Sequence, residues 1–326
     1  MEHTIEYTLN HIYNADATAL AFIEEWYNNL PYITAYTSGS TGKPKEIRLL
    51  KIDMIESAKA TCNYFNITNK SILVLPLSAS YIAGKMMIVR AIVSGATLWI
   101  EKASNKPISN EYTNIDLIAI VPSQVDWLIQ NNYACKIKNL LIGGGQLSQI
   151  RSDALINLGY NAYASYGMTE TCSHIALRHI SSQIYKTLPN ITISKDSRNC
   201  AIINAPKFSF KHITTNDIVE IIDDNTFKWI GRFDNIINTG GIKVSPEEIE
   251  QKIAQFISEP FYVIGEQDEK WGEVIVLYIE TNKSFNQDLL QTKLKQVLHK
   301  YFVPKKIKCV ASFHRTESGK IKRINF

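Results

Sequence analysis

The sequence has little of what marks a secreted, metal-binding or membrane-spanning protein. Its 326 residues include five widely spaced cysteines and no Cys-x-x-Cys pair. This spacing argues against a disulfide framework or a zinc site and fits a reducing compartment. No apolar run approaches the ~18 residues that span a bilayer. The start, residues 1–7, lacks the basic and apolar segments of a signal peptide. We therefore expect a cytoplasmic protein without membrane insertion.

The chain also lacks a strong net charge, internal repeats and low-complexity segments. A formal net charge of +4 is too slight to indicate a nucleic-acid partner. With 45% hydrophobic and 20% charged residues, the composition is typical of a soluble globular protein. The length is sufficient for one large domain and a smaller one.

A short stretch rich in Gly, Ser, Thr and Lys stands out near the start. Glycines let the backbone turn tightly, so that successive N–H groups form a concave nest for an anion, while hydroxyls and lysines add donors and charge. This predicts a polyphosphate site, although a flexible linker is the alternative. The stretch is not a Walker A motif, because position 37 is not Gly and Pro44 follows the lysine. Two strands, at 33–36 and 47–50, would flank it. The predicted binding residues are Thr37, Ser38, Gly39, Ser40, Thr41, Gly42 and Lys43.

Apolar runs alternate with helical patterns over the next hundred residues. Strands are expected at 71–76, 96–100, 115–121 and 139–142. Helices are expected at 15–30, 52–65, 85–93 and 122–130. Asp16 could cap the first helix, and Ile52, Ile55, Ala58 and Cys62 fall on one stripe of the second. This alternation predicts a largely parallel sheet, and ligands bind at the carboxyl ends of such strands. One strand is followed at once by Gly143, Gly144 and Gly145, where a flat ring could lie against bare backbone; an ordinary turn is the alternative.

A second group of polar residues follows a strand at 163–165. Tyr166 offers an aromatic face to adenine, Gly167 permits a tight turn, and Thr169 offers a hydroxyl to a phosphate. Glu170 is a hard oxygen ligand suited to Mg²⁺. Core packing for Tyr166 and a solvated surface position for Glu170 are the alternatives. Ser165 and Met168 complete the segment.

The last third predicts a β meander over 180–230 and then a small α+β unit. Asp217 ends one meander strand and could bind the two hydroxyls of a ribose. Ser245 as the N-cap and Pro246 at the first helical position predict the start of a helix. A further helix is expected at 287–300. Basic residues cluster near the end of the chain, either as a solvated surface or beside the phosphates of coenzyme A.

These segments resemble, in the same order, the motifs of the adenylate-forming superfamily, which includes acyl-CoA synthetases, adenylation domains and luciferases. The match covers about residues 33–326. It implies that Thr37 to Lys43 bind the ATP phosphates. Gly143 to Gly145 and Ser165 to Met168 would line the adenine site, and Asp217 and Arg232 would bind ribose and phosphate. Asn216, just before Asp217, stands where members have Gly, and Asn also tolerates a left-handed backbone. By the same resemblance the catalytic residues are Lys320, Thr169, Glu170 and Arg232, with Glu170 as the Mg²⁺ ligand and Asp234 as the hinge.

The resemblance also points to an acyl pocket. Its residues would be Tyr81, Gly84, Lys85 and His174. Tyr81 stands where many members have His, which leaves the usual role of that residue open. Lys85 is either a surface lysine or a cation that pairs with a second carboxylate on the substrate. His174 is either a structural donor or a pocket contact.

The implied fold is α/β: a shortened adenylate-forming large domain at 1–233, with a mainly parallel sheet and a β meander, and a mobile α+β lid at 234–326. Members usually have well over a hundred residues before the phosphate loop, whereas this chain has 36. A trimmed core or a covering partner would compensate, and a homodimer would bury that surface.

The implied activity is that of an AMP-forming acid–thiol ligase that uses ATP, Mg²⁺ and coenzyme A. The chain is most similar to compact o-succinylbenzoate–CoA ligases of menaquinone biosynthesis, whose aromatic dicarboxylate would give Lys85 a purpose. The alternatives are a ligase for another aryl or acyl acid, an enzyme that loads a carrier protein, and a non-catalytic protein that binds acyl-adenylate.

Overall fold

The computed structural model describes residues 11–37, 45–282, 286–315 and 321–326. It divides into two compact units. The first comprises Met1–Leu147, Arg151–Thr192 and Asn204–Ile213. The second comprises Ser148–Ile150, Ile193–Ile203 and Thr214–Phe326. Within the described residues no helix is long and apolar enough to cross a membrane. The predicted boundary after residue 233 separates a large domain from a lid that rotates as a body, and it stays a prediction.

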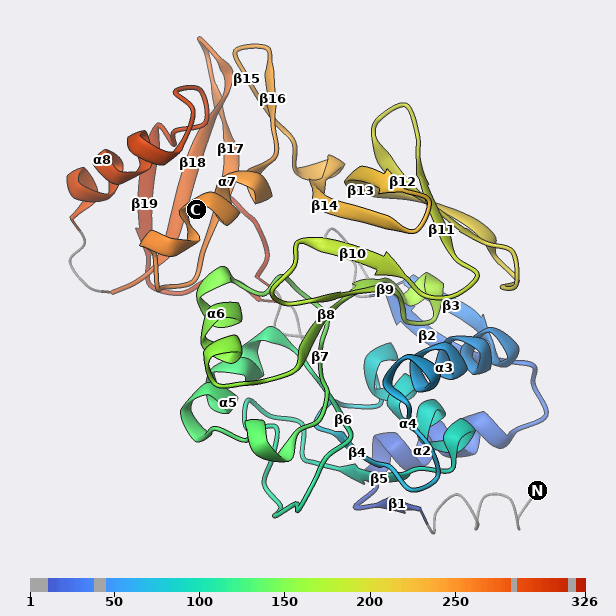
Figure 1. The fold of residues 1–326 in the computed structure, drawn as a ribbon. Helices are drawn as coiled ribbons and strands as arrows, with labels where there is room; N and C mark the ends of the chain where they lie inside the picture. The colour runs from blue at the N-terminus through green and yellow to red at the C-terminus, as the bar shows by residue number, and fades with distance from the viewer. Residues whose placement is uncertain (1–10, 38–44, 283–285, 316–320) are drawn as a thin grey trace. The chain divides into compact units, whose positions relative to one another are not determined.

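A largely parallel sheet forms the centre of the first unit (Figure 1). Neighbouring strands follow the order β1-β5-β4-β6-β7-β8-β9-β10. The pairs from β1 to β8 are parallel, and β9 and β10 add antiparallel pairs. The bounds are β1 Ile12–Tyr13, β4 Ile72–Leu75, β5 Thr97–Ile100, β6 Leu117–Ile120, β7 Leu140–Ile142, β8 Ala162–Gly167, β9 His174–His179 and β10 Ile184–Thr187. The predicted parallel sheet is confirmed.

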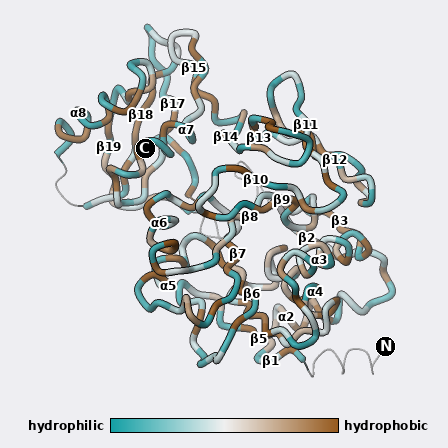
Figure 2. The backbone as a smooth tube through the Cα atoms, in the orientation of Figure 1, coloured by the Kyte–Doolittle hydropathy of each residue, from teal (hydrophilic) through white to brown (hydrophobic). Residues whose placement is uncertain are grey.

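Helices cover both faces of this sheet. Figure 1 shows α2, α3 and α4 on one face and α5 and α6 on the other. The central strands β4, β6 and β7 are apolar at every position, as expected for strands that are covered on both faces. Figure 2 shows β6 and β7 in hydrophobic colours. Ile118 and Ile120 pack with Val125, Leu128 and Leu155 of the second helical layer. The bounds are α2 Ala17–Tyr27, α3 Lys51–Phe65, α4 Ile82–Ser94, α5 Val125–Asn131 and α6 Gln149–Asn157.

Two of these helices differ from their predictions. In α3 the expected inward stripe is partly wrong, because Ile52 is 65% exposed while Met54, one of the residues between the predicted positions, is fully buried. Asp53 is also buried and accepts hydrogen bonds from the backbone and hydroxyl of Ser209. Helix α4 begins three residues earlier than predicted and includes Gly84.

The second unit contains most of the predicted β meander and the whole α+β unit; residues 180–192 and 204–213 of the meander belong to the first unit. The meander strands lie in the order β14-β13-β12-β11, and the C-terminal sheet in the order β16-β15-β18-β17, with β19 parallel to β18. Helices α7 and α8 pack on that sheet around an apolar core that includes Ile249, Leu277 and Leu294. The bounds are β11 Thr192–Lys195, β12 Cys200–Ala205, β13 Lys211–Asp223, β14 Thr226–Arg232, β15 Ile237–Thr239, β16 Ile242–Val244, α7 Pro246–Ile253, β17 Phe261–Asp268, β18 Gly272–Glu280, α8 Gln287–Val297 and β19 Lys306–Val310.

Several of the basic residues near the end of the chain pair with acids of the C-terminal sheet and of α7, whereas Lys300, Lys305 and Lys322 are exposed. Lys308 Nζ lies 2.6 Å from Glu266 Oε1, and Arg315 Nη1 donates to Glu280 Oε1 at 2.8 Å. Arg323 binds Glu250 with both terminal nitrogens. These acids come from β17, β18 and α7, so the pairs fix the last strand and the tail of the chain to the C-terminal sheet.

Candidate active site

The predicted phosphate loop joins two paired strands. β2 (Tyr32–Thr37) and β3 (Lys45–Leu50) form an antiparallel hairpin in which Thr37 lies opposite Lys45. Strand β2 contacts the 3₁₀ turn Thr169–Thr171. The base of the loop and the predicted Mg²⁺ ligand therefore belong to one neighbourhood of the first unit. The loop residues Ser38, Gly39, Ser40, Thr41, Gly42 and Lys43 lie outside the described residues.

The triple glycine follows β7 at the carboxyl end of the parallel sheet, beside the end of β8. A Cβ on Gly143 would lie 2.7 Å from the Ser165 hydroxyl oxygen, and Gly144 has a left-handed backbone with φ +79°. Ser165 in turn donates to the Ile142 carbonyl at 3.2 Å. The close approach explains the need for glycine here. Gly144 and Gly145 are exposed, so their bare backbone is open to a ligand.

Tyr166 is 9% exposed and its ring lies 5.9 Å from that of Tyr185 in a tilted arrangement. The register of β8 against β9 shifts between Tyr166 and Gly167. A Cβ on Gly167 would collide with the Ser173 carbonyl, so glycine is required where the two strands approach each other. Tyr166 therefore has a packing role in its own right, and its stacking on adenine stays a prediction.

The 3₁₀ turn after Met168 presents the predicted catalytic residues. Thr171 stabilises the turn, because its hydroxyl accepts from the Met168 N–H and donates to the Ser173 carbonyl. Thr169 is half-buried and Glu170 is exposed. No cluster of three or more His, Cys, Asp or Glu able to hold a metal occurs in the described part of the chain. Glu170 alone fits a Mg²⁺ that is held mainly by phosphate oxygens.

The predicted acyl-pocket residues around the start of α4 have different surroundings. Tyr81 is 36% exposed at the N-cap position. Gly84 is buried, and a Cβ there would collide with the Ser78 carbonyl, so its glycine serves helix–loop packing.

Lys85 is not a surface lysine. Only 8% of the residue is exposed, and its Nζ lies 3.2 Å from Glu25 Oε2. The ammonium also lies 4.6 Å from the centre of the Phe22 ring. Glu25 accepts a second hydrogen bond, from the Thr34 N–H at 2.7 Å. Lys85 thus has a protein carboxylate as partner, and its pairing with a substrate carboxylate stays a prediction.

His174 lies in a buried polar cluster between α3, α4 and β9. Its Nε2 is 3.1 Å from the Thr61 hydroxyl and its Nδ1 is 3.3 Å from the Ser173 hydroxyl. Burial, together with the nearby positive charge of Arg90, holds the pKa of His174 well below its usual range. The ring is therefore neutral, and its contacts are those of a structural hydrogen-bonding residue.

Arg90, in the same cluster, is a functional candidate that sequence reasoning missed. It is 2% exposed, and Nη2 donates to the Ser173 hydroxyl at 2.8 Å. Its Nε has no hydrogen-bond partner, and no acid among the described residues forms an ion pair with it. Burial lowers the pKa of Arg90 to about 10. The available signal was a single charge inside the apolar run Met86–Ala91.

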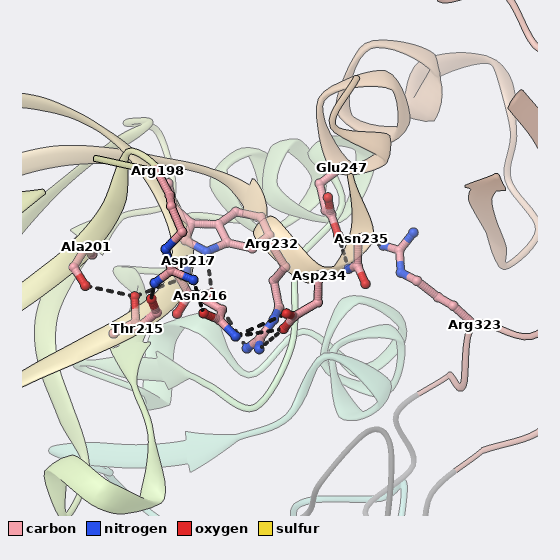
Figure 3. A network of polar contacts seen from close by, with 11 residues as sticks. Arg198, Ala201, Thr215, Asn216, Asp217, Arg232, Asp234, Asn235, Glu247 and Arg323 are labelled. Atoms are coloured by element: carbon pink, nitrogen blue, oxygen red, sulfur yellow. Dashed lines mark hydrogen bonds and ion pairs between the residues drawn. The ribbon is translucent and has the colours of Figure 1, made fainter. Parts of the chain in front are cut away.

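In the second unit the predicted ribose and hinge residues come together (Figure 3). Asp217 lies inside β13 and not at the predicted strand end. It lies opposite Arg232 on β14, and Arg232 Nη1 is 3.8 Å from Asp217 Oδ1. Trp229 Nε1 donates to the same oxygen at 3.2 Å. Arg232 Nη2 also donates to Asp234 Oδ2 at 2.9 Å. One guanidinium therefore lies between two carboxylates.

Asn216 does not have the left-handed backbone that its comparison with glycine suggested. It lies within the extended strand β13, and its side chain is what matters. The amide nitrogen donates to both oxygens of Asp234, at 3.0 and 3.2 Å. The amide oxygen accepts from Arg198 Nη1 at 3.0 Å.

The residue after the predicted hinge is fixed by α7. Asn235 donates to Glu247 Oε1 at 2.5 Å, and Ser245 donates to Glu247 Oε2 at 3.0 Å instead of capping the helix backbone as predicted. A Cβ on Gly231 would lie 2.6 Å from Glu247 Oε2, which explains the glycine before Arg232. Lys320 lies outside the described residues.

Two family models match this chain. The model of the AMP-binding enzyme family matches residues 16–206, and that of the AMP-binding enzyme C-terminal domain matches residues 244–320. The chain belongs to the family of AMP-binding enzymes.

Several relatives refine the comparison. A 2-succinylbenzoate–CoA ligase from Listeria monocytogenes is 26% identical over 331 residues, which cover 92% of this chain and 70% of the relative. An acyl-CoA synthetase (AMP-forming)/AMP-acid ligase II-like protein from Dyadobacter fermentans is 31% identical, with a TM-score of 0.63, and the match covers 94% of this chain and 92% of that one. The o-succinylbenzoate CoA synthetase of Bacillus subtilis, solved with its acyl-adenylate intermediate, has a TM-score of 0.78 at 23% identity, over 89% of this chain and 67% of its own.

The expected superfamily, fold class and enzymatic nature are thereby confirmed. The individual roles of the site residues stay predictions, because neither the family match nor the geometry described above tests them.

Proposed function

We propose that this enzyme is an ATP-dependent, AMP-forming 2-succinylbenzoate–CoA ligase, a step in menaquinone biosynthesis. The relatives of that name support the reaction class and the acid. The observation that carries the choice of acid is Arg90. A buried guanidinium without a counter-ion is unfavourable by several kcal/mol, as an order-of-magnitude figure. A substrate with a second carboxylate would compensate for it.

The position of Arg90 favours this use. Its guanidinium contacts Ser173, three residues after Glu170, so it touches the same segment that carries the predicted catalytic turn. Its unpartnered Nε is a free donor in an environment of low dielectric, where a charge-assisted hydrogen bond to a carboxylate is strong. Benzoate or a fatty acid, with one carboxylate consumed by the reaction, would leave Arg90 unpaired.

In the first half-reaction a substrate carboxylate oxygen attacks the α-phosphorus of ATP, and the bond to pyrophosphate breaks. We assign Thr37 to Lys43 to the phosphates, Gly143 to Gly145 and Tyr166 to adenine, and Asp217 to ribose. Lys320 and Arg232 would neutralise charge that develops at the α-phosphate. The contribution of the protein is positioning and electrostatics.

Mg²⁺ would be held by phosphate oxygens and Glu170, and it would supply positive charge to the leaving pyrophosphate. Thr169 would donate its hydroxyl to the α-phosphate. Rotation about Asp234 would then withdraw Lys320 from the site. In the second half-reaction the thiolate of coenzyme A attacks the acyl carbon, the carbon–oxygen bond breaks, and AMP leaves.

The test is AMP release from ATP, Mg²⁺ and coenzyme A with 2-succinylbenzoate, beside benzoate, 4-chlorobenzoate and a medium-chain fatty acid. The thioester is identified by its mass. We expect turnover with 2-succinylbenzoate and at least about a hundredfold lower kcat/KM with each monocarboxylate, because a missing charged partner in a buried site costs about 3 kcal/mol.

The other outcomes separate the alternatives. Turnover with a monocarboxylate alone would overturn the choice of acid and keep the reaction class. Adenylate formation without any thioester to coenzyme A would favour a carrier-protein thiol as acceptor. Tight nucleotide binding without AMP release from any acid would favour a non-catalytic protein. A homodimer and a cytoplasmic location stay predictions, for sedimentation analysis and cell fractionation.

A further inference from the structure

The turn between β11 and β12 carries a rigidly held arginine. Asp196 Oδ1 accepts from the N–H groups of Arg198 and Cys200, at 2.8 and 2.9 Å. Asp196 Oδ2 accepts from Arg198 Nε at 2.8 Å. Three hydrogen bonds to one carboxylate fix both the turn and the direction of the arginine side chain.

From this position Arg198 reaches two neighbours of the predicted hinge residue, Asp234. Its Nη1 donates to Asn216 Oδ1 at 3.0 Å, and its guanidinium carbon lies 5.1 Å from the centre of the Phe233 ring. Nη2 adds a hydrogen bond to the Thr215 carbonyl at 3.3 Å. Arg198 thus binds the residue that precedes Asp234 and the strand beside it.

The chemistry of these groups leaves one orientation for the Asn216 amide. A guanidinium only donates hydrogen bonds, so the amide oxygen must face Arg198. A carboxylate only accepts, so the amide nitrogen must face Asp234. The two hydrogen bonds from Asn216 to Asp234, at 3.0 and 3.2 Å, follow from this alternation, which Figure 3 shows.

We propose that Arg198 and Asn216 are positioning residues that clasp Asp234 and so bias the equilibrium of the hinge. Neither touches the reacting atoms in this scheme. They hold the side chain of Asp234 and the ring of Phe233 in one arrangement, and rotation about residue 234 has to release them. The proposal rests on the hinge role assigned above to Asp234. A hinge is a small set of residues that absorbs a large change in φ and ψ, so side-chain bonds on it alter the populations of its two states.

Fluorescence energy transfer tests the clasp in the full-length enzyme. Cys135 in the first unit and Cys309 in the second are exposed, whereas Cys62, Cys172 and Cys200 are buried, so two dyes can be attached to natural cysteines. Single-molecule transfer efficiencies are recorded for the wild type without ligand, with ATP and Mg²⁺, and with coenzyme A added.

Substitution of Asn216 or Arg198 should change the ratio of the populations of the two hinge states, which the transfer efficiencies report. Asn216→Ala should shift it about threefold to tenfold, because the lost hydrogen bonds are partly exposed. Asn216→Asp should shift it further in the same direction, since it sets a second negative charge against Asp234. Arg198→Ala should act like Asn216→Ala. Glu220→Ala, which breaks an exposed pair with Lys228 on the same two strands, is the matched control and should leave the ratio unchanged.

The kinetic readout is the ratio of the rates of the two half-reactions. Pyrophosphate exchange reports adenylation, and thioester formation from preformed adenylate reports the second step. The ratio of these rates should change in Asn216→Ala and Asn216→Asp and stay constant in Glu220→Ala.

The proposal is overturned if the populations in Asn216→Ala and Asn216→Asp equal those of the wild type, or if the wild type shows one unchanging population in all ligand states. The failure of the proposed function is a separate result, since it appears as absence of AMP release in the wild type.

Discussion

Arg90 and Arg323 are two cations that the fold takes largely out of water in opposite ways. Arg323 meets two buried acids: it binds Glu250 with both terminal nitrogens, and Glu247 Oε1 lies 3.5 Å from Nη2. Burial alone would lower the pKa of Arg323, but the ion pair with Glu250 outweighs it and the pKa is raised. The Arg90 guanidinium donates to the Ser173 hydroxyl and forms no ion pair with a carboxylate among the described residues, and burial lowers its pKa to about 10.

This difference in partners distinguishes a cation with a structural role, Arg323, from one that is suited to bind a ligand, Arg90. Arg323 is satisfied inside the protein, where it ties the end of the chain to α7 and to the Val263 carbonyl of β17. Arg90 keeps an unpartnered Nε in a cluster that contains no acid among the described residues. A fold selected for stability alone would place an apolar residue there, because an unpaired buried charge is destabilising.

The largest expected effect is the loss of stability on removing Arg323 from its ion pair with Glu250. Arg323→Ala leaves Glu247 and Glu250 buried without their cation, so the free energy of unfolding should fall by about 3–5 kcal/mol. Urea denaturation measures this. Arg315→Ala is the matched control, because Arg315 also pairs with an acid, Glu280, but its own side chain is 37% exposed. The control should lose about 1 kcal/mol or less. Equal losses in both variants would contradict the structural role of Arg323.

A smaller effect is expected for Lys85→Met. The change removes the partner of Glu25, but Glu25 is 28% exposed at its side chain and keeps the Thr34 hydrogen bond. The free energy of unfolding should fall by about 1–2 kcal/mol. The KM for 2-succinylbenzoate should change less than about threefold, where a direct charge-assisted contact would give tenfold or more. A large rise in KM would restore Lys85 as the cation that binds the substrate.

The smallest effect is a pH dependence that reports on the Arg90 cluster. Folded His174 stays neutral below its usual pKa of 6.5, whereas the unfolded chain takes up a proton there. The native state therefore loses stability as the pH falls below 6.5, by up to about 1.4 kcal/mol per pH unit. His174→Gln should remove this part of the slope, as measured by urea denaturation between pH 7 and the acid limit of reversible unfolding. An identical slope in the variant would show that His174 is protonated in the native state.

Much of the fold and several site positions could be predicted because their signals are local. Apolar runs such as Ile72–Leu75 and glycine-rich turns such as Gly143–Gly145 carry their own backbone preferences. The helix cap at Asp16 was predicted from one polar residue before a helical pattern and is confirmed by its bond to the Ala19 N–H at 2.9 Å.

What could not be predicted depends on partners far away in the sequence. Arg323 and Glu250 are 73 residues apart, and Asp53 finds Ser209 across 156 residues. No local sequence pattern predicts such pairs. For the same reason the sequence does not distinguish Lys85, in the first turns of α4, from a surface lysine, nor does it reveal the role of Arg90 further along the same helix.

Substitution of Arg90 tests the central claim most directly. Steady-state kcat/KM for 2-succinylbenzoate and for benzoate would be measured in the wild type, Arg90→Met and Lys85→Met, with unfolding free energies as the check on folding. The account predicts that Arg90→Met lowers kcat/KM for 2-succinylbenzoate about thirtyfold to a hundredfold and leaves kcat/KM for benzoate nearly unchanged, because only the second carboxylate loses its partner. The free energy of unfolding should stay the same or rise, because an unpaired buried charge is removed. Unchanged discrimination between the two acids in a folded Arg90→Met, or its loss in Lys85→Met instead, would contradict the account.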